Sequence, residues 1–266
     1  MEQLDRIIEQ DDIKRCIIVL DAHDNYLEDE YQFERAMRFL PLNIQRRILN
    51  KRGDARNTAL CNQLLQLITC SKFSKLPRQM IEFSHSEKGK PYLKNSTGLS
   101  FSMSNSDSRT AIYMKRTQGH SDVGMDMAST KDCQRWESNY LDLFQDIFSS
   151  EEYSFLRRAP RGDIRDKLFT HYWSLKEAYT KYTGTGLNCD LSRLDFGEIK
   201  AASLEEFREH ISILDGKSFL FLSKWLTENS IVTVCDGPLT GSDESSSISV
   251  VELNVRTIVD NLDSMK

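Results

Sequence analysis

The sequence predicts a mixed α/β fold made of two lobes. Short apolar runs typical of buried strands alternate with amphipathic helical stretches along the 266-residue chain. This mixture repeats loosely in the two halves, and a guide value of about 150 residues per domain allows two domains. We therefore expect two similar α/β (α+β) lobes at residues 1–121 and 122–266, with a flexible loop at 236–250.

The first half of the chain is expected to contain three strands and a helical segment. Residues 15–22 form a continuous apolar run, which predicts a buried strand. From about residue 31 to 69 the apolar residues recur at helical spacing, interrupted at Pro41. Two further strands, joined by a polar turn, are expected at 100–104 and 110–116.

The second half contains the longest predicted helix. Ser149, followed by Glu152 three residues later, forms a capping-box pattern that predicts a helix start. A long helix is expected from about Asp163 to Tyr182, ending at Gly184. Strands are expected at 123–128, 194–199, 217–222, 230–235 and 250–255.

The charge balance disfavours a general attraction to nucleic acid. Lys and Arg number 35 against 40 Asp and Glu, which leaves a net charge of −5. Positive charge is concentrated locally, because residues 44–56 hold five basic side chains and one acidic one, or +4. A basic binding surface is therefore expected to be local.

We expect a cytoplasmic protein that acts as a monomer. The six cysteines are scattered without Cys-x-x-Cys spacing, which predicts neither a zinc site nor a disulfide framework. The first twelve residues are acid-rich and unlike a signal peptide, and no apolar run approaches the ~18 residues of a membrane helix.

Asp126 is a carboxylate within the apolar stretch VGMDMA at 123–128. Strand alternation places it on the same face as Gly124 and Ala128, between two small side chains. A buried carboxylate needs a cation or hydrogen-bond donors. Asp126 is therefore either a ligand of a hard cation such as Mg²⁺, or a strand-end residue that caps or faces solvent.

Trp173, Glu177 and Lys181 follow one another at intervals of one helical turn in the segment WSLKEAYTK. One interpretation is that Glu177 and Lys181 form a solvent-exposed ion pair. Trp173 on the same stripe favours a second interpretation, because a large aromatic ring is seldom left in water. In this interpretation the helix borders a cleft, and the charges of Glu177 and Lys181 hold a metal and a phosphate.

The segments GKPYL at 89–93 and FSMSNS at 101–106 gather lysines, hydroxyls and amides around turns. Such donors suit phosphate oxygens. A plain hairpin with a Ser/Asn turn explains the same pattern, and the glycines match neither a P-loop nor a dinucleotide-binding motif.

Taken in order, GKPYL, FSMSNS, VGMDMA, FSSEEY and WSLKEAYTK followed by GTGL resemble the 4′-phosphopantetheinyl transferases of the surfactin-synthetase-activating class, over about residues 15–235. The resemblance implies two similar lobes related by a pseudo-twofold axis, with the site between them. It implies Mg²⁺-dependent transfer of the phosphopantetheine arm of coenzyme A to a serine of an apo carrier protein, releasing adenosine 3′,5′-bisphosphate.

The resemblance also implies roles for individual residues. Asp126 and Glu177 match the metal-binding carboxylates, one from each side of the lobe interface, and Glu177 also matches the proposed general base. Lys181 matches a lysine that contacts the phosphates of coenzyme A and stabilises the leaving bisphosphate. The other expected cofactor-binding residues are Arg52, Arg56, Lys88, Gly89, Lys90, Pro91, Ser104 and Asn105.

Two positions depart from the bacterial pattern. Ala128 stands where many bacterial members have a third carboxylate, and Asn105 where many have a histidine. An apolar residue at the first position resembles the eukaryotic branch. By the same resemblance, the acceptors are expected to include the aminoadipate reductase of lysine biosynthesis.

The same residues are also compatible with two other classes of function. Another Mg²⁺-dependent phosphoryl-transfer enzyme or a nuclease would use the same carboxylates, and a nuclease would also bind nucleic acid through residues 46–56. A non-catalytic protein that binds coenzyme A or a carrier would tolerate Ala128 and Asn105 more easily.

Overall fold

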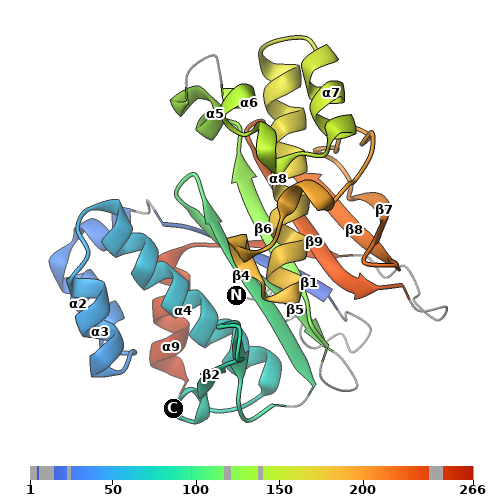
Figure 1. Ribbon diagram of the computed structural model, residues 1–266. Coiled ribbons are helices and arrows are strands. Elements are labelled where there is room, and N and C mark those ends of the chain that lie inside the picture. The colour runs from blue at the N-terminus through green and yellow to red at the C-terminus, as the bar shows by residue number, and fades with distance from the viewer. Residues whose placement is uncertain are drawn as a thin grey trace. The chain divides into compact units, whose positions relative to one another are not determined.

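A computed structural model describes residues 5, 15–22, 25–96, 98–116, 121–136, 140–239 and 248–265. These residues form two compact units, of which the first combines the chain up to 116 with residues 248–265, and the second comprises residues 121–239. Each unit contains a four-stranded sheet and a 21-residue helix (Figure 1), as expected for an α/β fold. In the described part of the chain, no helix has the length and apolar character needed to cross a membrane.

The helices and strands follow one another in mixed order along the chain. In sequence order they are β1 (Arg15–Asp21), α2 (Glu30–Met37), α3 (Leu42–Leu49), α4 (Asp54–Ser74), β2 (Phe83–His85), β3 (Pro91–Leu93), β4 (Leu99–Ser106), β5 (Arg109–Arg116), β6 (Gly124–Ser129), α5 (Lys131–Arg135), α6 (Tyr140–Leu143), α7 (Ser150–Arg158), α8 (Asp163–Thr183), β7 (Arg208–Leu214), β8 (Lys217–Trp225), β9 (Ser230–Pro238), β10 (Ser249–Leu253) and α9 (Val255–Ser264).

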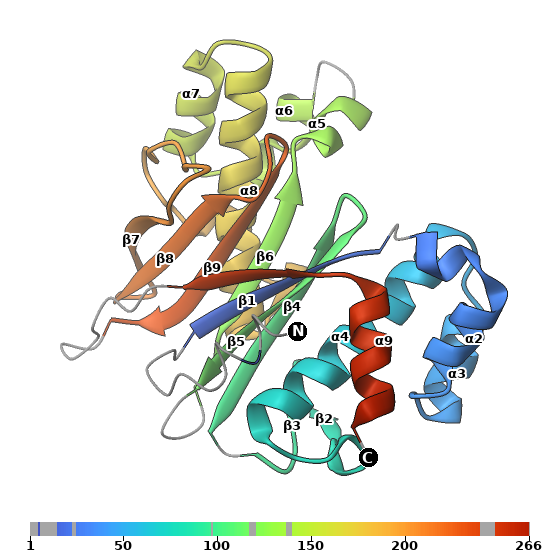
Figure 2. The ribbon, with the colours of Figure 1, turned by 180° about the vertical axis from the view of Figure 1, so that it is seen from behind.

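The sheet of the first unit has the order β10-β1-β5-β4. β5 pairs antiparallel with both neighbours, whereas β10 runs parallel to β1. Helices α4 and α9 lie side by side against this sheet (Figures 1 and 2). The central strands are therefore covered by helices from both ends of the sequence.

The C-terminal segment corrects the expected lobe assignment. It was expected in the second lobe, but β10 and α9 belong to the first unit, because β10 pairs with β1 and α9 packs on α4. The expected flexible loop at 236–250 overlaps β9 at its start and β10 at its end, and residues 240–247 lie outside the described residues.

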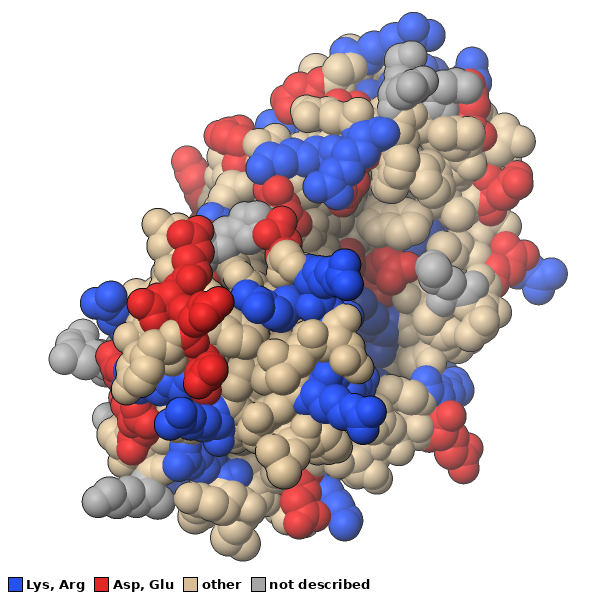
Figure 3. Space-filling model, turned by 90° about the vertical axis from the view of Figure 1, so that its left-hand side faces the viewer, with Lys and Arg blue, Asp and Glu red and all other residues tan. Residues whose placement is uncertain are grey.

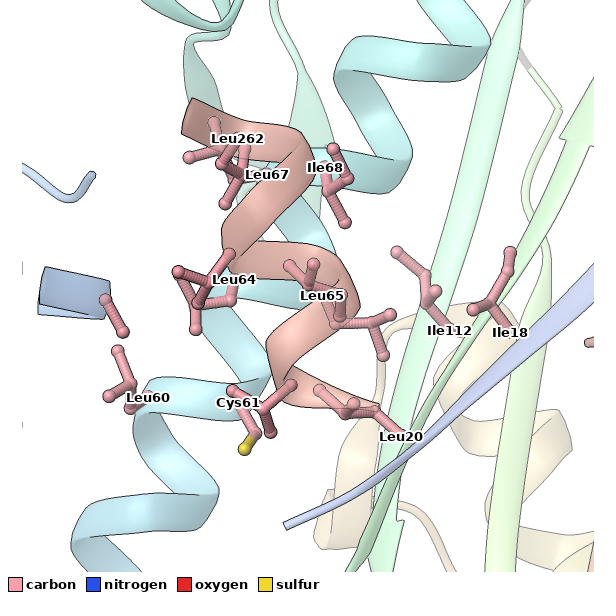
Figure 4. Packing of buried hydrophobic residues seen from close by; sticks show 14 of the residues in the cluster. Ile18, Leu20, Leu60, Cys61, Leu64, Leu65, Leu67, Ile68, Ile112 and Leu262 are labelled. Carbon is pink, nitrogen blue, oxygen red and sulfur yellow. The ribbon is translucent and has the colours of Figure 1, made fainter. Parts of the chain in front are cut away.

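The core of the first unit forms around α4 (Figure 4). Its expected apolar stripe is fully buried, and Leu65 lies among side chains from α9 and the strands β1 and β5. The four stripe residues are Leu60, Leu64, Leu65 and Ile68. Burying a large aliphatic side chain contributes roughly 1.5–3 kcal/mol, so this helix anchors the unit.

The sheet of the second unit has the antiparallel order β6-β9-β8-β7, with α8 packed on it. The prediction of a strand at 194–199 is wrong, because the chain is irregular there. β7 follows at Arg208–Leu214 instead. Its sequence REHISIL alternates weakly and leaves Ile211 and Ile213 exposed at the sheet edge, which explains why the pattern did not reveal it.

A buried ion pair ties α7 and α8 together. The capping box of Ser149 and Glu152 is present as expected, and the Glu152 carboxylate also accepts a hydrogen bond from the backbone N–H of Phe196. Lys176 Nζ lies 2.8 Å from Glu152 Oε2, with both side chains fully buried. Lys176 also donates to the backbone carbonyl of Leu191, so both charges are fully hydrogen-bonded.

We expect Lys176→Met to lower the free energy of unfolding by about 3–5 kcal/mol, because it leaves a buried carboxylate without its cation. Replacing both partners, as in Glu152→Met with Lys176→Met, should lower it by less than the sum of the two single changes. Urea unfolding measures both values.

The exposed pair Arg158–Glu198, 2.8 Å apart, is the matched control, and Arg158→Met should change the unfolding free energy by at most about 1 kcal/mol. Equal effects at the buried and exposed pairs would contradict the anchoring role of Lys176.

Candidate functional site

The candidate site of the second unit begins where α8 approaches β6 at Gly124. A Cβ atom at this position would lie 1.9 Å from the Ala178 carbonyl oxygen and 2.5 Å from the Tyr182 nitrogen. Any side chain would therefore push α8 away from the strand. This contact fixes which residues of α8 face β6.

Asp126 and Lys181 form an ion pair across this contact. Lys181 Nζ lies 2.9 Å from Asp126 Oδ1, with the Asp126 side chain 7% and the Lys181 side chain 28% exposed. The alternative of a solvent-exposed pair between Glu177 and Lys181 is wrong, because Lys181 pairs with the strand. The stripe borders β6, since Trp173 packs against the cluster that includes Ala128.

Glu177 lies on the same side of α8, one turn before Lys181. Its Oε1 atom is buried and has no hydrogen-bond partner within the described chain. Burial raises the pKa of Glu177, the charge of Asp126 raises it further, and Lys181 lowers it. Two carboxylates therefore repel one another here, and the ammonium of Lys181 partly compensates their charge.

This arrangement fits a hard divalent cation. The donor set consists of carboxylate oxygens, which Mg²⁺ prefers, and the buried Glu177 Oε1 is available as a ligand atom. The described residues contain no cluster of three or more His, Cys, Asp or Glu side chains. At the position of a third carboxylate, Ala128 is buried against Trp225 and Ile231.

The expectation that Asp126 and Glu177 come from opposite sides of a lobe interface is wrong. Both residues belong to the second unit, on β6 and α8. The physical reason is that α8 packs directly on β6, and the sequence pattern does not show this contact between a strand and a helix.

A pocket of about 420 Å³ lies in the first unit. Asn105, an expected site residue, lines it from the end of β4. The other lining residues come from α3, the turn after it and α4: Ile44, Arg47, Ile48, Lys51, Ala55, Thr58, Ala59, Asn62 and Gln63. None of them is acidic, so the pocket suits an anion.

The basic residues of this pocket are not the two that the resemblance implied. Arg47 and Lys51 line it, whereas Arg52 and Arg56 do not. The guanidinium of Arg56 lies 4.3 Å from the ring centroid of Phe33 instead. The excess of +4 over residues 44–56 includes both pairs, and the sequence alone does not show which of them lines the pocket.

The other expected residues of the first unit lie in two places. Lys88, Gly89 and Lys90 belong to the tight connection between β2 and β3, where Gly89 has a φ of +82° and its N–H donates to the Ser86 carbonyl. Pro91 is the first residue of β3. Ser104 is buried within β4, next to Asn105.

Comparison with known proteins matches both units. The N-terminal family of 4′-phosphopantetheinyl transferases matches residues 27–115, and the 4′-phosphopantetheinyl transferase superfamily matches residues 122–235. The L-aminoadipate-semialdehyde dehydrogenase-phosphopantetheinyl transferase of Saccharomyces cerevisiae is 41% identical over 223 residues, covering 82% of this chain and 79% of the relative. The chain belongs to the 4′-phosphopantetheinyl transferase superfamily.

Further relatives extend the match within this superfamily. The protein of the same name from Candida glabrata is 37% identical over 220 residues, which cover 82% of both chains. The 4′-phosphopantetheinyl transferase Sfp of Bacillus subtilis is 31% identical over 138 residues, covering 52% of this chain and 56% of the relative. The expected family and fold class are confirmed, and the chain is a transferase with coenzyme A as a substrate and a carrier protein as acceptor.

We expect Asp126→Asn to lower the pKa of Glu177 in this transferase, because it removes a negative charge that disfavours ionisation. Lys181→Met should raise that pKa, because it removes the compensating cation. Carboxyl-carbon NMR titration of the metal-free protein measures both shifts. Asp163→Asn, at the exposed start of α8, is the control, and an unchanged Glu177 titration in Asp126→Asn would contradict the coupling.

Proposed function

We propose that this chain transfers the 4′-phosphopantetheine arm of coenzyme A to a serine hydroxyl in the carrier domain of an L-aminoadipate-semialdehyde dehydrogenase, which is also called an aminoadipate reductase. The other product is adenosine 3′,5′-bisphosphate. The observation that carries this proposal is the group of Asp126, Glu177 and Lys181 at the contact of β6 with α8. The names and coverage of the fungal relatives support the acceptor.

Asp126 and Glu177 are the proposed ligands of Mg²⁺. They supply the two carboxylates of the group formed by Asp126, Glu177 and Lys181. Glu177 Oε1 accepts no hydrogen bond from the other described residues, so none has to break when a metal binds there. Bound there, Mg²⁺ would supply charge compensation for the pyrophosphate during in-line attack. Ala128 contributes no ligand atom, and Mg²⁺ readily keeps waters in such positions.

Glu177 is also the proposed general base. In the metal-free protein, burial and the charge of Asp126 raise its pKa. A carboxylate placed within reach of the serine hydroxyl can accept its proton as general base. Lys181 holds an ammonium beside these carboxylates, where it can contact the phosphates and stabilise the leaving bisphosphate. Catalysis of the transfer would thus depend on the positioning of the reacting groups and on these charges.

The first unit supplies the proposed contacts to coenzyme A. Asn105 and the cations Arg47 and Lys51 line the pocket, and α4 begins at its wall with Ala55 and Thr58, where a helix N-terminus favours an anion. Lysine and arginine side chains gather in patches on the face that Figure 3 shows, which suits a polyanionic substrate on a chain of net charge −5. We also propose contacts to coenzyme A from Arg52, Arg56, Lys88, Gly89, Lys90, Pro91 and Ser104.

We also propose that the transferase acts as a cytoplasmic monomer. The structure shows no disulfide bond at any of the six cysteines, all of which lie in its described part. Burial raises the pKa of Cys16 and Cys133 to about 12, so these two thiols are poorly reactive. Size-exclusion chromatography with light scattering tests the oligomeric state.

We expect incubation with coenzyme A, Mg²⁺ and an apo carrier domain of an L-aminoadipate-semialdehyde dehydrogenase to add one phosphopantetheine arm to the carrier. Intact-mass spectrometry measures this gain. Glu177→Gln should lower the transfer rate about 10²–10⁴-fold, as expected for loss of a general base and a metal ligand. Glu151→Gln, at the exposed start of α7, is the matched control with an unchanged rate.

Three outcomes would oppose the proposal. A wild-type rate for Glu177→Gln removes the assigned role of that residue. Binding of coenzyme A without a mass gain on several carriers favours a non-catalytic binding protein. Salt-sensitive binding and cleavage of nucleic acid favours a nuclease.

A further inference from the structure

We propose that Thr110 is a positioning residue that orients Asn62 and Asn105 as hydrogen-bond donors for a phosphate group of coenzyme A. The proposal rests on the function proposed above and adds two residues that neither the motifs nor the family resemblance pointed to. Asn62 lies on α4 and Thr110 on β5, so the arrangement joins three separate elements of the first unit.

A tight hairpin brings Asn105 and Thr110 together. β4 and β5 are joined by Asp107 and Ser108 alone, with φ values of +48° and +64°. Two central residues with positive φ are typical of a type I′ turn, which matches the twist of the two strands. The register places Asn105 directly opposite Thr110, so their side chains lie on the same face of the sheet.

The Thr110 hydroxyl contacts both amide groups. Thr110 is fully buried, and its Oγ1 atom is within hydrogen-bond distance of Asn62 Oδ1 and lies 3.2 Å from Asn105 Oδ1. Both amides thus turn their oxygen toward the hydroxyl, which shares its single hydrogen between the two acceptors and makes the closer contact with Asn62. Since the oxygen and the NH₂ group lie on opposite sides of an amide, each asparagine keeps its two N–H donors for another partner.

The pocket supplies the reason for this orientation. Asn62 and Asn105 both line it, together with Arg47 and Lys51, and no acidic side chain does. Neither cation forms an ion pair with another described residue, so their charges are available to a ligand. Two cations with several neutral N–H donors and no carboxylate match the acceptor-only oxygens of a phosphate.

Thr110→Val tests the proposal, because it removes the hydroxyl and keeps the shape of the side chain. Isothermal titration calorimetry with adenosine 3′,5′-bisphosphate should show binding weakened by roughly 5- to 30-fold, while Thr110→Ser retains the hydroxyl and should bind within ~2-fold of wild type. The matched control is Thr69→Val on α4, whose buried hydroxyl has no hydrogen-bond partner in the described chain, and whose affinity should stay unchanged.

Coupling between the variants separates positioning from simple packing. In a protein that already carries Asn62→Ala and Asn105→Ala, the further change Thr110→Val should have no added effect on bisphosphate binding. Full additivity would overturn the proposal, as would equal affinity of Thr110→Val and wild type. Should Thr110→Val fail to fold by circular dichroism, Asn62→Ala alone must weaken binding by a similar factor, or the proposal is wrong.

Two forms of the cofactor distinguish the phosphate involved. If Thr110→Val raises the KM for coenzyme A but not for 3′-dephospho-coenzyme A, the asparagines hold the 3′-phosphate, whereas equal increases assign them to the pyrophosphate. An unchanged KM for both overturns the proposal. Failure of the wild-type protein to modify any carrier would refute the proposed function, while the calorimetric comparison would still decide the role of Thr110.

Discussion

The close approach of α8 to β6 is the constraint on which the arrangement of Asp126, Glu177 and Lys181 in the second unit depends. Gly124 meets the backbone of α8 near Ala178 and Tyr182, and only a residue without a side chain allows this contact. Two residues further along the same face of the strand, Asp126 meets Lys181. Alternate residues of the strand share a face, so the contact at Gly124 also fixes how Asp126 faces the helix. This brings Asp126 near enough to Glu177 to raise the pKa of Glu177.

Two neighbouring residues of α8 differ in how far their buried charges are hydrogen-bonded. Lys176 and Glu177 are adjacent in sequence and therefore point about 100° apart around the helix. Lys176 is fully buried with its charge matched by Glu152 and backbone carbonyls, so it anchors the helix. Glu177 keeps a buried oxygen without a hydrogen-bond partner in the described chain. The same turn therefore holds one charge whose hydrogen bonds are satisfied and one carboxylate oxygen that accepts none from the described chain, as the proposed role of Glu177 in binding requires.

Local patterns in the sequence predicted local structure well and contacts between elements poorly. The capping box at Ser149, the long helix and the isolated carboxylate at Asp126 follow from spacing alone. The choice of partner for Lys181 does not, because Glu177 one turn away and Asp126 on another element are equally compatible with the pattern. β10 was predicted as a strand, but its pairing with β1 depends on a contact between the two ends of the chain.

The binding groups of the two units differ in charge, and this difference has a chemical consequence. The second unit collects Asp126 and Glu177 with a single ammonium, so a polyanion is repelled there unless a divalent cation is present. The pocket of the first unit offers Arg47, Lys51 and neutral amides, and its lining contains no carboxylate, so we expect it to bind phosphate without a metal. Removal of Mg²⁺ should therefore abolish transfer while leaving much of the affinity for the nucleotide, because the two sets of residues depend on the metal to different degrees.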